Sequence, residues 1–254
     1  MESSDDRKVR VRLDERKEGV VAYLTIDNAR RLNAMNGALM DEFATALTQL
    51  GGDERLRAVV LTGAGPKAFI VGADINELAG LRNAGEAKAF ITRLHRCCDA
   101  IRGLPVPVIA RIQGFCFGAG LEIAAACDVR IAAEEASFGM PEVKLGIPSV
   151  IEAALLPLLV GWGRTREILL LGDTLKASDA LAWRLVEHVV PAAGLDPAVE
   201  AWIARLDACQ VARKDNRGHH QDYRKRHLEG HEPSPTVPAA ARQSAHTAGT
   251  LFER

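Results

Sequence analysis

The alternation of apolar and polar residues predicts short strands along most of the chain. Residues 20–26 (VVAYLTI) form a β-branched run that is typical of a buried strand, whereas apolar residues in 9–13 alternate with charged ones as in an exposed strand. Comparable apolar runs recur further along the chain. The predicted strands are residues 9–13, 20–26, 57–63, 108–112, 128–133 and 186–190.

Apolar residues three or four positions apart predict helices between these strands. Leu39, Phe43 and Leu47 share one face of a helix that Asn36 can cap and that Gly51 ends. Strands that alternate with helices indicate an α/β fold with largely parallel strand pairing. The predicted helices are residues 39–50, 86–101, 121–127, 150–160, 164–171, a short one that begins at Ser178, and 199–206.

Composition and charge exclude several classes of protein. The formal net charge is -1, with 32 Lys and Arg against 33 Asp and Glu, so no global attraction to nucleic acid or to an acidic membrane is expected. The longest run without these four residue types is 153–163, well short of the roughly 20 residues of a transmembrane helix. No apolar stretch follows the start MESSDDRK, so no secretory signal is expected. The five cysteines are odd in number, so no disulfide framework is expected. We therefore expect a cytoplasmic protein.

The last part of the chain has a different composition. Five of the seven histidines fall in residues 210–254, and large apolar residues are sparse there. Such a segment buries too little surface to offset its conformational entropy, so we expect a divergent, poorly ordered polar tail. The predicted organisation is a core at 1–190, a helical segment at 191–209 and this tail at 210–254.

Two carboxylates are candidates for chemistry. Glu122 lies in the apolar helix start GAGLEIAAACD, and Glu142 follows a proline in FGMPEVKLG. An acid in apolar surroundings has a raised pKa, which suits proton transfer near neutral pH. The residues alone equally allow a helix-dipole contact for Glu122 and a solvated loop position for Glu142. The glycine loops FIVGADI and FGAGLE could present backbone N–H groups, whereas phosphate-loop, serine-hydrolase and zinc motifs are absent.

The motifs together resemble the crotonase superfamily, the enoyl-CoA hydratase/isomerase family. The resemblance is carried by LTGAGPKAFIVGADI, by PVIARIQGFCFGAGLEIAAACDVRIAAEEASFGMPEVKLGIP and by GWGRTREILLLGDTLKASDALAWRLVEHVVP, in family order within residues 9–208. After Glu142 the chain reads PSVIEAALL where the family text is glycine-rich. The resemblance implies a spiral of repeated ββα units, followed by a helical C-terminal region that is used in trimerisation.

The resemblance also implies a site for a CoA thioester. In the family, two backbone N–H groups hold the thioester oxygen, and these positions fall on Ala73 and Ala119. The two hydratase glutamates fall on Glu122, which would orient or activate water, and on Glu142, which would supply the C2 proton. The family positions near the CoA nucleotide fall on Arg30, Arg31, Leu32, Ala73, Asp74, Ile75 and Asn76.

The presence of both glutamates favours a hydratase that adds water to a 2-enoyl-CoA. The alternatives are an enoyl-CoA isomerase, another CoA-thioester hydrolase or lyase, and a non-catalytic acyl-CoA-binding paralogue. Coenzyme A would be part of the substrate, so no separate cofactor and no metal are expected. The expected assembly is a homotrimer or a dimer of trimers, which the unusual tail would weaken.

Overall fold

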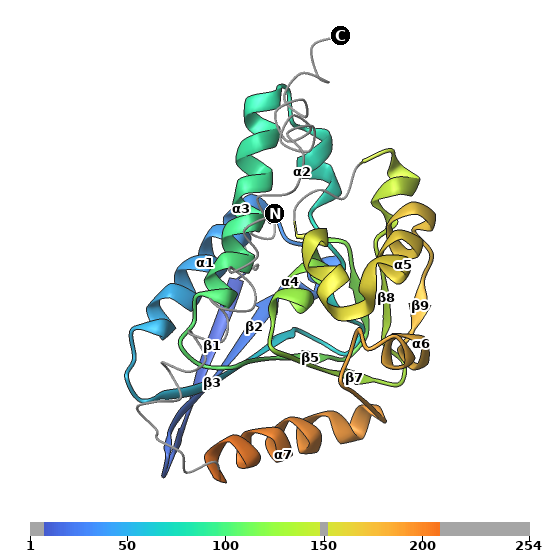
Figure 1. The fold of residues 1–254 in the computed structure, drawn as a ribbon. Coiled ribbons are helices and arrows are strands. Elements are labelled where there is room, and N and C mark those ends of the chain that lie inside the picture. Colours follow the sequence, from blue (N-terminus) through green and yellow to red (C-terminus); the bar gives the residue numbers. More distant parts are fainter. Residues whose placement is uncertain (1–7, 148–151, 209–254) are drawn as a thin grey trace, which may run out of the picture.

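The computed structural model describes residues 8–147 and 152–208 (Figure 1). These ranges hold two sheets with helices packed around them, which confirms a mixed α/β fold. The predicted polar tail at 210–254 lies outside the described residues. In the described part of the chain, no helix is both long and apolar enough to cross a membrane.

A six-stranded sheet forms the base of the molecule. Its strand order is β1-β2-β3-β5-β7-β10, in which β1 and β2 are antiparallel and the other neighbours are parallel. The predicted parallel pairing is therefore confirmed for most of this sheet. Its strands are β1 (Lys8–Arg16), β2 (Gly19–Asp27), β3 (Leu56–Gly63), β5 (Val108–Ile112), β7 (Val129–Ala133) and β10 (His188–Val190).

A second sheet of four very short strands was not predicted from the sequence. Its order is β4-β6-β8-β9, and the strands are β4 (Ala68–Ile70), β6 (Phe115–Phe117), β8 (Ser137–Gly139) and β9 (Leu175–Lys176). None of these four segments is among the strands predicted from the sequence. Strands of two or three residues are too short for a period-two pattern, so only their pairing with neighbours reveals them.

Successive segments of the chain add one strand to each sheet. β3 leads to β4, β5 leads to β6 and β7 leads to β8, and each pair places its second strand in the small sheet. A helix follows β6 directly, namely α4 (Ala119–Ala126). This repeated strand–strand–helix plan brings the loops after β4, β6 and β8 to one side, because β4, β6 and β8 are parallel neighbours.

The helices cover both faces of the large sheet. α1 (Gly37–Gly51) packs against α3 (Ala84–Arg102), and α7 (Leu195–Ala208) covers the opposite face (Figure 1). The Asn36 side chain accepts a hydrogen bond from the Leu39 N–H at 2.9 Å, which confirms the predicted cap. The other helices are α2 (Ile75–Ala79), α5 (Leu156–Leu171), α6 (Ala177–Ala182) and the 3-10 turns Ala29–Arg31, Pro141–Leu145, Ala153–Leu155 and Ala192–Gly194.

The last helices differ in their bounds from the prediction. α5 consists of two helical parts that meet at a kink at Gly161, whose φ of 74° and ψ of 165° are not helical, which agrees with the two helices expected on either side of this glycine. Glycine adopts this positive φ without steric cost, so the chain can change direction at Gly161 between the two helical parts. α6 begins at Ala177 rather than Ser178, and α7 extends the predicted helix at both ends.

Candidate active site

Glu122 lies in the first turn of α4 and points into the protein interior. Every residue of this helix is buried, and Glu122 is only 3% exposed. Gly120 allows the helix to approach β4, because a Cβ there would lie 2.0 Å from the carbonyl oxygen of Ile70. The close packing carries the Glu122 carboxylate out of water while leaving it at the N-terminal end of α4.

Burial is the main cause that raises the pKa of Glu122 to about 7. The backbone N–H of Glu152 donates to Glu122 Oε1 at 2.9 Å. This hydrogen bond and the N–H of Ala153 lower the pKa of Glu122 and so oppose the effect of burial. The negative charges of Glu142 and Glu152 raise the pKa further. Glu122 can therefore gain or lose a proton near neutral pH, as acid–base chemistry requires.

Glu142 reaches the same end of α4 from another element. It follows Pro141 in the 3-10 turn after β8, and its carboxylate lies against Gly118, the residue before α4. A Cβ on Gly118 would lie 2.5 Å from Glu142 Oε1, and the φ of 51° is also one that L residues rarely adopt. The structure thus brings together the two carboxylates that are 20 positions apart in the sequence.

The backbone N–H groups of Ala73 and Ala119 belong to this region as well. Ala119 is the first residue of α4, so its N–H has no acceptor within the helix. The Met35 N–H donates to the Gly72 carbonyl, and the Met35 carbonyl accepts from the Asp74 N–H. In this parallel bridge the N–H of the intervening Ala73 points away from Met35. A Cβ on Gly72 would lie 3.8 Å from the Ala119 nitrogen, so the two segments are adjacent.

The two loops predicted to contact CoA also lie side by side. Arg31 Nη1 is 2.9 Å from Asp74 Oδ2, and Asp74 is buried at the start of α2, where its side chain accepts from the Asn76 N–H at 3.0 Å. Ile75 is exposed beside them. Arg30 and Leu32 line a cavity of about 310 Å³ together with Ala29 and residues 64–68.

A third glutamate near Glu122, Glu152, was not predicted from the sequence. Glu152 is 5% exposed, and its Oε1 lies 2.5 Å from Nδ1 of His95 on α3. Asp99 Oδ2 lies 3.0 Å from the other ring nitrogen, Nε2. These three side chains hold possible metal-ligand atoms within 4.8 Å of one another, yet both ring nitrogens already face carboxylates.

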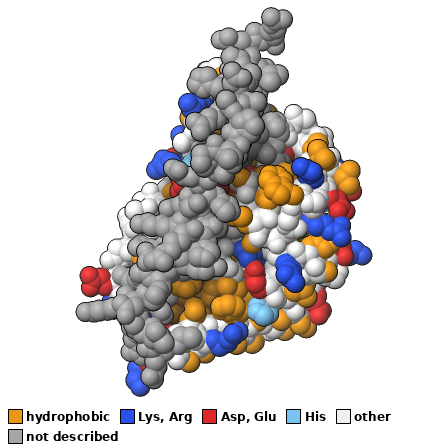
Figure 2. Space-filling view, in the orientation of Figure 1, with side chains coloured by type: hydrophobic (Ala, Val, Ile, Leu, Met, Phe, Trp, Pro, Cys, Tyr) orange, Lys and Arg blue, Asp and Glu red, His pale blue; other side chains and the backbone are white. Residues whose placement is uncertain are grey.

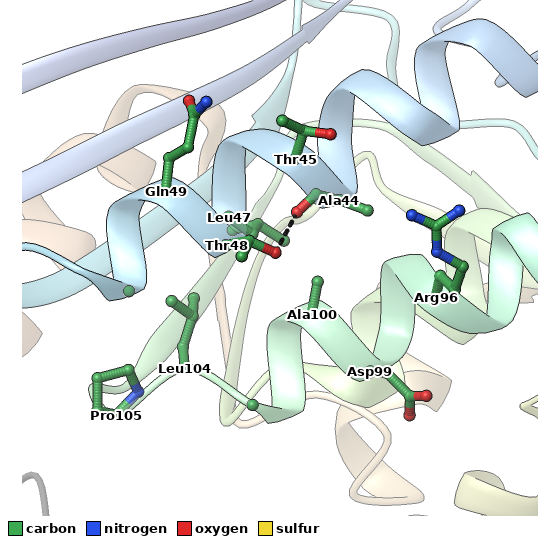
Figure 3. A pocket seen from close by; sticks show the side chains of 12 residues that line it. Ala44, Thr45, Leu47, Thr48, Gln49, Arg96, Asp99, Ala100, Leu104 and Pro105 are labelled. Atoms are coloured by element: carbon green, nitrogen blue, oxygen red, sulfur yellow. Dashed lines mark hydrogen bonds between the residues drawn. The ribbon is translucent and has the colours of Figure 1, made fainter.

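A larger cavity is lined by neither Glu122 nor Glu142, although Asp99 lies at it. It has a volume of about 710 Å³ and runs between α1 and α3, where Leu47 and Ala100 face each other across it (Figure 3). None of the site residues predicted from the sequence lines this cavity. The region around Glu122, which holds the titratable groups and the free amides, is therefore the stronger candidate for the active site.

Comparison with known proteins identifies relatives that agree with one another in their family. A family model described as enoyl-CoA hydratase/isomerase matches residues 15–226. The chain is 40% identical over 175 residues to a short-chain-enoyl-CoA hydratase of Clostridium acetobutylicum, which covers 68% of this chain and 67% of that protein. It is 37% identical over 191 residues to a crotonyl-CoA hydratase of Syntrophomonas wolfei, which covers 75% and 73% respectively.

Solved structures give the same result for the fold. An enoyl-CoA hydratase from Bacillus anthracis has a TM-score of 0.77 and 33% identity, covering 84% of this chain and 81% of that one. One from Mycobacterium smegmatis has a TM-score of 0.80 and 28% identity, covering 96% and 91%. These matches confirm the crotonase-type fold that the sequence motifs implied. The chain belongs to the enoyl-CoA hydratase/isomerase family.

Proposed function

We propose that the protein is an enoyl-CoA hydratase, which adds water across the double bond of a 2-enoyl-CoA thioester. The observation that carries the proposal is the pair of glutamates that meet near the start of α4, of which Glu122 has its pKa raised to about 7. The names of the two curated relatives, a short-chain-enoyl-CoA hydratase and a crotonyl-CoA hydratase, support a short-chain substrate such as crotonyl-CoA.

In the proposed reaction, the two carboxylates hold one water molecule between them. Glu122 orients or activates the water, whose hydroxide forms a bond to C3 while the π-electron pair moves toward C2. Glu142 supplies a proton to C2, and the proton that the water loses is taken up by Glu122 and passes on to Glu142, so both carboxylates are restored, one water is consumed and the thioester leaves as the 3-hydroxyacyl form. A carboxyl group with a pKa near 7 suits this work, because it gains and loses a proton at nearly equal cost.

The charge that develops on the thioester oxygen needs donors that are already in place. We propose the backbone N–H groups of Ala73 and Ala119 for this role. Ala119 adds the positive end of the α4 dipole, and burial of the whole helix strengthens such interactions by excluding water. The adjacency of Gly72 to the Ala119 amide supports a shared acceptor.

The CoA part of the substrate is proposed to bind along the paired loops. Arg30 and Arg31 bring positive charge, Leu32 adds an apolar contact, and the segment Ala73–Asn76 supplies backbone groups. The ion pair between Arg31 and Asp74, at 2.9 Å, supports one continuous surface. Coenzyme A then enters as part of the substrate, and the homotrimeric assembly and cytoplasmic location stay predictions.

Three substrates separate this function from its alternatives. Purified protein is incubated with crotonyl-CoA, 3-hexenoyl-CoA and a saturated acyl-CoA, and the products are analysed by mass spectrometry. Hydration of crotonyl-CoA, with a mass gain of one water, is the expected result. A double-bond shift in 3-hexenoyl-CoA alone would indicate an isomerase, release of free CoA would indicate a hydrolase, and binding without turnover would indicate a non-catalytic paralogue.

A further inference from the structure

The side chain of His95 bridges two carboxylates near the candidate site. His95 lies on α3, about half exposed, with Nδ1 2.5 Å from Glu152 Oε1 and Nε2 3.0 Å from Asp99 Oδ2. An ionised carboxylate only accepts hydrogen bonds, so the contact with Glu152 is a hydrogen bond when Nδ1 carries a proton, whereas the contact with Asp99 is an ion pair when the ring is charged. His95 therefore joins the solvent-exposed surface of α3 to a carboxylate in the interior.

Glu152 takes part in two contacts in opposite directions. Its side chain is 6% exposed and extends to His95, whereas its backbone N–H donates to Glu122 Oε1 at 2.9 Å. A buried carboxylate costs free energy unless it is paired, so the contact with His95 fixes where Glu152 lies. Fixing the side chain also fixes the backbone N–H that reaches Glu122.

We propose that His95 and Glu152 are positioning residues for Glu122, an inference that rests on the hydratase function proposed above. His95 holds the Glu152 side chain, and Glu152 thereby keeps its N–H aimed at the Glu122 carboxylate. This N–H stabilises the ionised form and so opposes the effect of burial. The arrangement sets both the orientation of Glu122 and the pH at which it ionises.

Among the residues that the structure describes, the other ionisable groups near Glu122 come from separate elements. They are Glu142 in the 3-10 turn after β8, the Glu152 carboxylate ahead of the turn at 153–155, and the Cys98 thiol of α3, whose pKa is raised well above its usual range by burial. Of these residues, Glu152 both bears a charge and donates its N–H to Glu122. A change at His95 should therefore reach Glu122 through Glu152.

Three variants and one control test the proposal by kinetics. His95→Ala removes the anchor, His95→Gln keeps a side-chain N–H donor, and Glu152→Gln keeps an acceptor for His95. With crotonyl-CoA, His95→Ala should lower kcat by about tenfold or more, because a charge-assisted hydrogen bond is lost, while KM stays within about twofold. His95→Gln should recover most of this loss, and Glu152→Gln should keep most of kcat.

The control is Arg93→Gln on the same helix. Arg93 Nε contacts Asp41 Oδ2 of α1 at 3.0 Å, so the variant also removes a contact between α3 and a neighbouring element. It should leave kcat and its pH profile unchanged. Glu152→Gln, which removes a negative charge beside Glu122, should shift the pH profile of kcat to lower pH and so tests the electrostatic contact, whereas recovery of kcat in His95→Gln relative to His95→Ala tests the positioning role.

A second measurement needs no enzymatic activity. The amide proton of Glu152, observed by NMR with ¹⁵N-labelled glutamate, should shift as Glu122 ionises, and this titration should vanish in Glu122→Gln. His95→Ala should reduce the titration by at least half, and His95→Gln should restore it. Such a response would show that His95 controls the contact between the Glu152 N–H and Glu122.

The two measurements together decide between the possible outcomes. If the wild-type protein hydrates crotonyl-CoA but His95→Ala changes only one of kcat and the amide titration, or neither, the positioning proposal is wrong. If the wild-type protein is inactive toward all enoyl-CoA substrates, the hydratase function is rejected. In that case the amide titration alone decides whether His95 positions Glu152 against Glu122.

Discussion

At the scale of single residues, Glu122 combines burial with a contact that the sequence did not predict. The apolar helix start GAGLEIAAACD indicated a buried acid, and the structure confirms that Glu122 is 3% exposed. Glu152 was not predicted as a partner, because PSVIEAALL has the pattern of an ordinary helix start. Its contact to His95 spans 57 positions and depends on the packing of both α3 and the turn at 153–155 against α4.

The raised pKa of Glu122 predicts a pH-dependent difference in stability between wild type and Glu122→Gln. Between the ordinary value of 4.5 and about 7, the folded protein binds a proton at Glu122 that the unfolded chain has lost. The free energy of unfolding of wild type therefore falls across this window as pH rises. Glutamine does not titrate, so the free energy of unfolding of the variant, relative to that of wild type, should increase from pH 4.5 to 7 and then level off.

Chemical denaturation of both proteins at several pH values measures this difference directly. The pH-dependent contributions of groups that do not interact with Glu122 cancel in the comparison, because the two chains differ at one position. A difference in unfolding free energy that is constant from pH 4.5 to 8 would show that Glu122 ionises normally in the folded protein.

At the scale of elements, long periodic segments were predictable and short ones were not. The helix after Asn36 and the strand at 108–112 agree with their predicted positions, because each has enough residues to display a period. The three-residue strands β4, β6 and β8 are too short to display a period and were not predicted, although they carry the loops that form the site. Family motifs indicated Ala73 and Ala119, but their adjacency follows from the pairing of β4 with β6.

The start of α4 predicts a test of backbone donation. Ala119→Pro removes the N–H, and proline is tolerated in the first turn of a helix. The loss of one such donor should lower kcat about 10²–10³-fold. Ala119→Gly keeps the N–H and should retain activity. Circular dichroism establishes that both variants fold, and equal rates for the two would exclude this amide from the oxyanion site.

At the scale of the whole molecule, the described residues form two cores on the two faces of the large sheet. α1, α3 and α4 enclose one, and α7 covers the other. α5 nevertheless keeps apolar side chains in solvent, with Trp162 67% and Leu170 70% exposed. Figure 2 shows orange side chains on the right of the molecule, where Figure 1 places α5. Exposed apolar surface of this kind is typical of an interface.

We predict that α5 contributes to contacts between copies of the chain. Leu170→Asp should lower the mass measured by light scattering, because burying a charge against an apolar surface is costly. Leu13→Asp, an exposed position on β1, serves as the control and should leave the mass unchanged. A chain that ends at Ala208 should assemble like the full chain. Dissociation on this truncation, with no effect of Leu170→Asp, would assign assembly to the residues after 208.

The central claim is that Glu122 and Glu142 together add water to a 2-enoyl-CoA. The most direct test is the rate of crotonyl-CoA hydration by wild type, Glu122→Gln and Glu142→Gln, with binding of the thioester measured in parallel. Each variant should lose about 10²–10⁴-fold in kcat while binding persists, because acid–base catalysis contributes on that order. Hydration by either folded variant within tenfold of the wild-type rate would contradict the two-carboxylate mechanism.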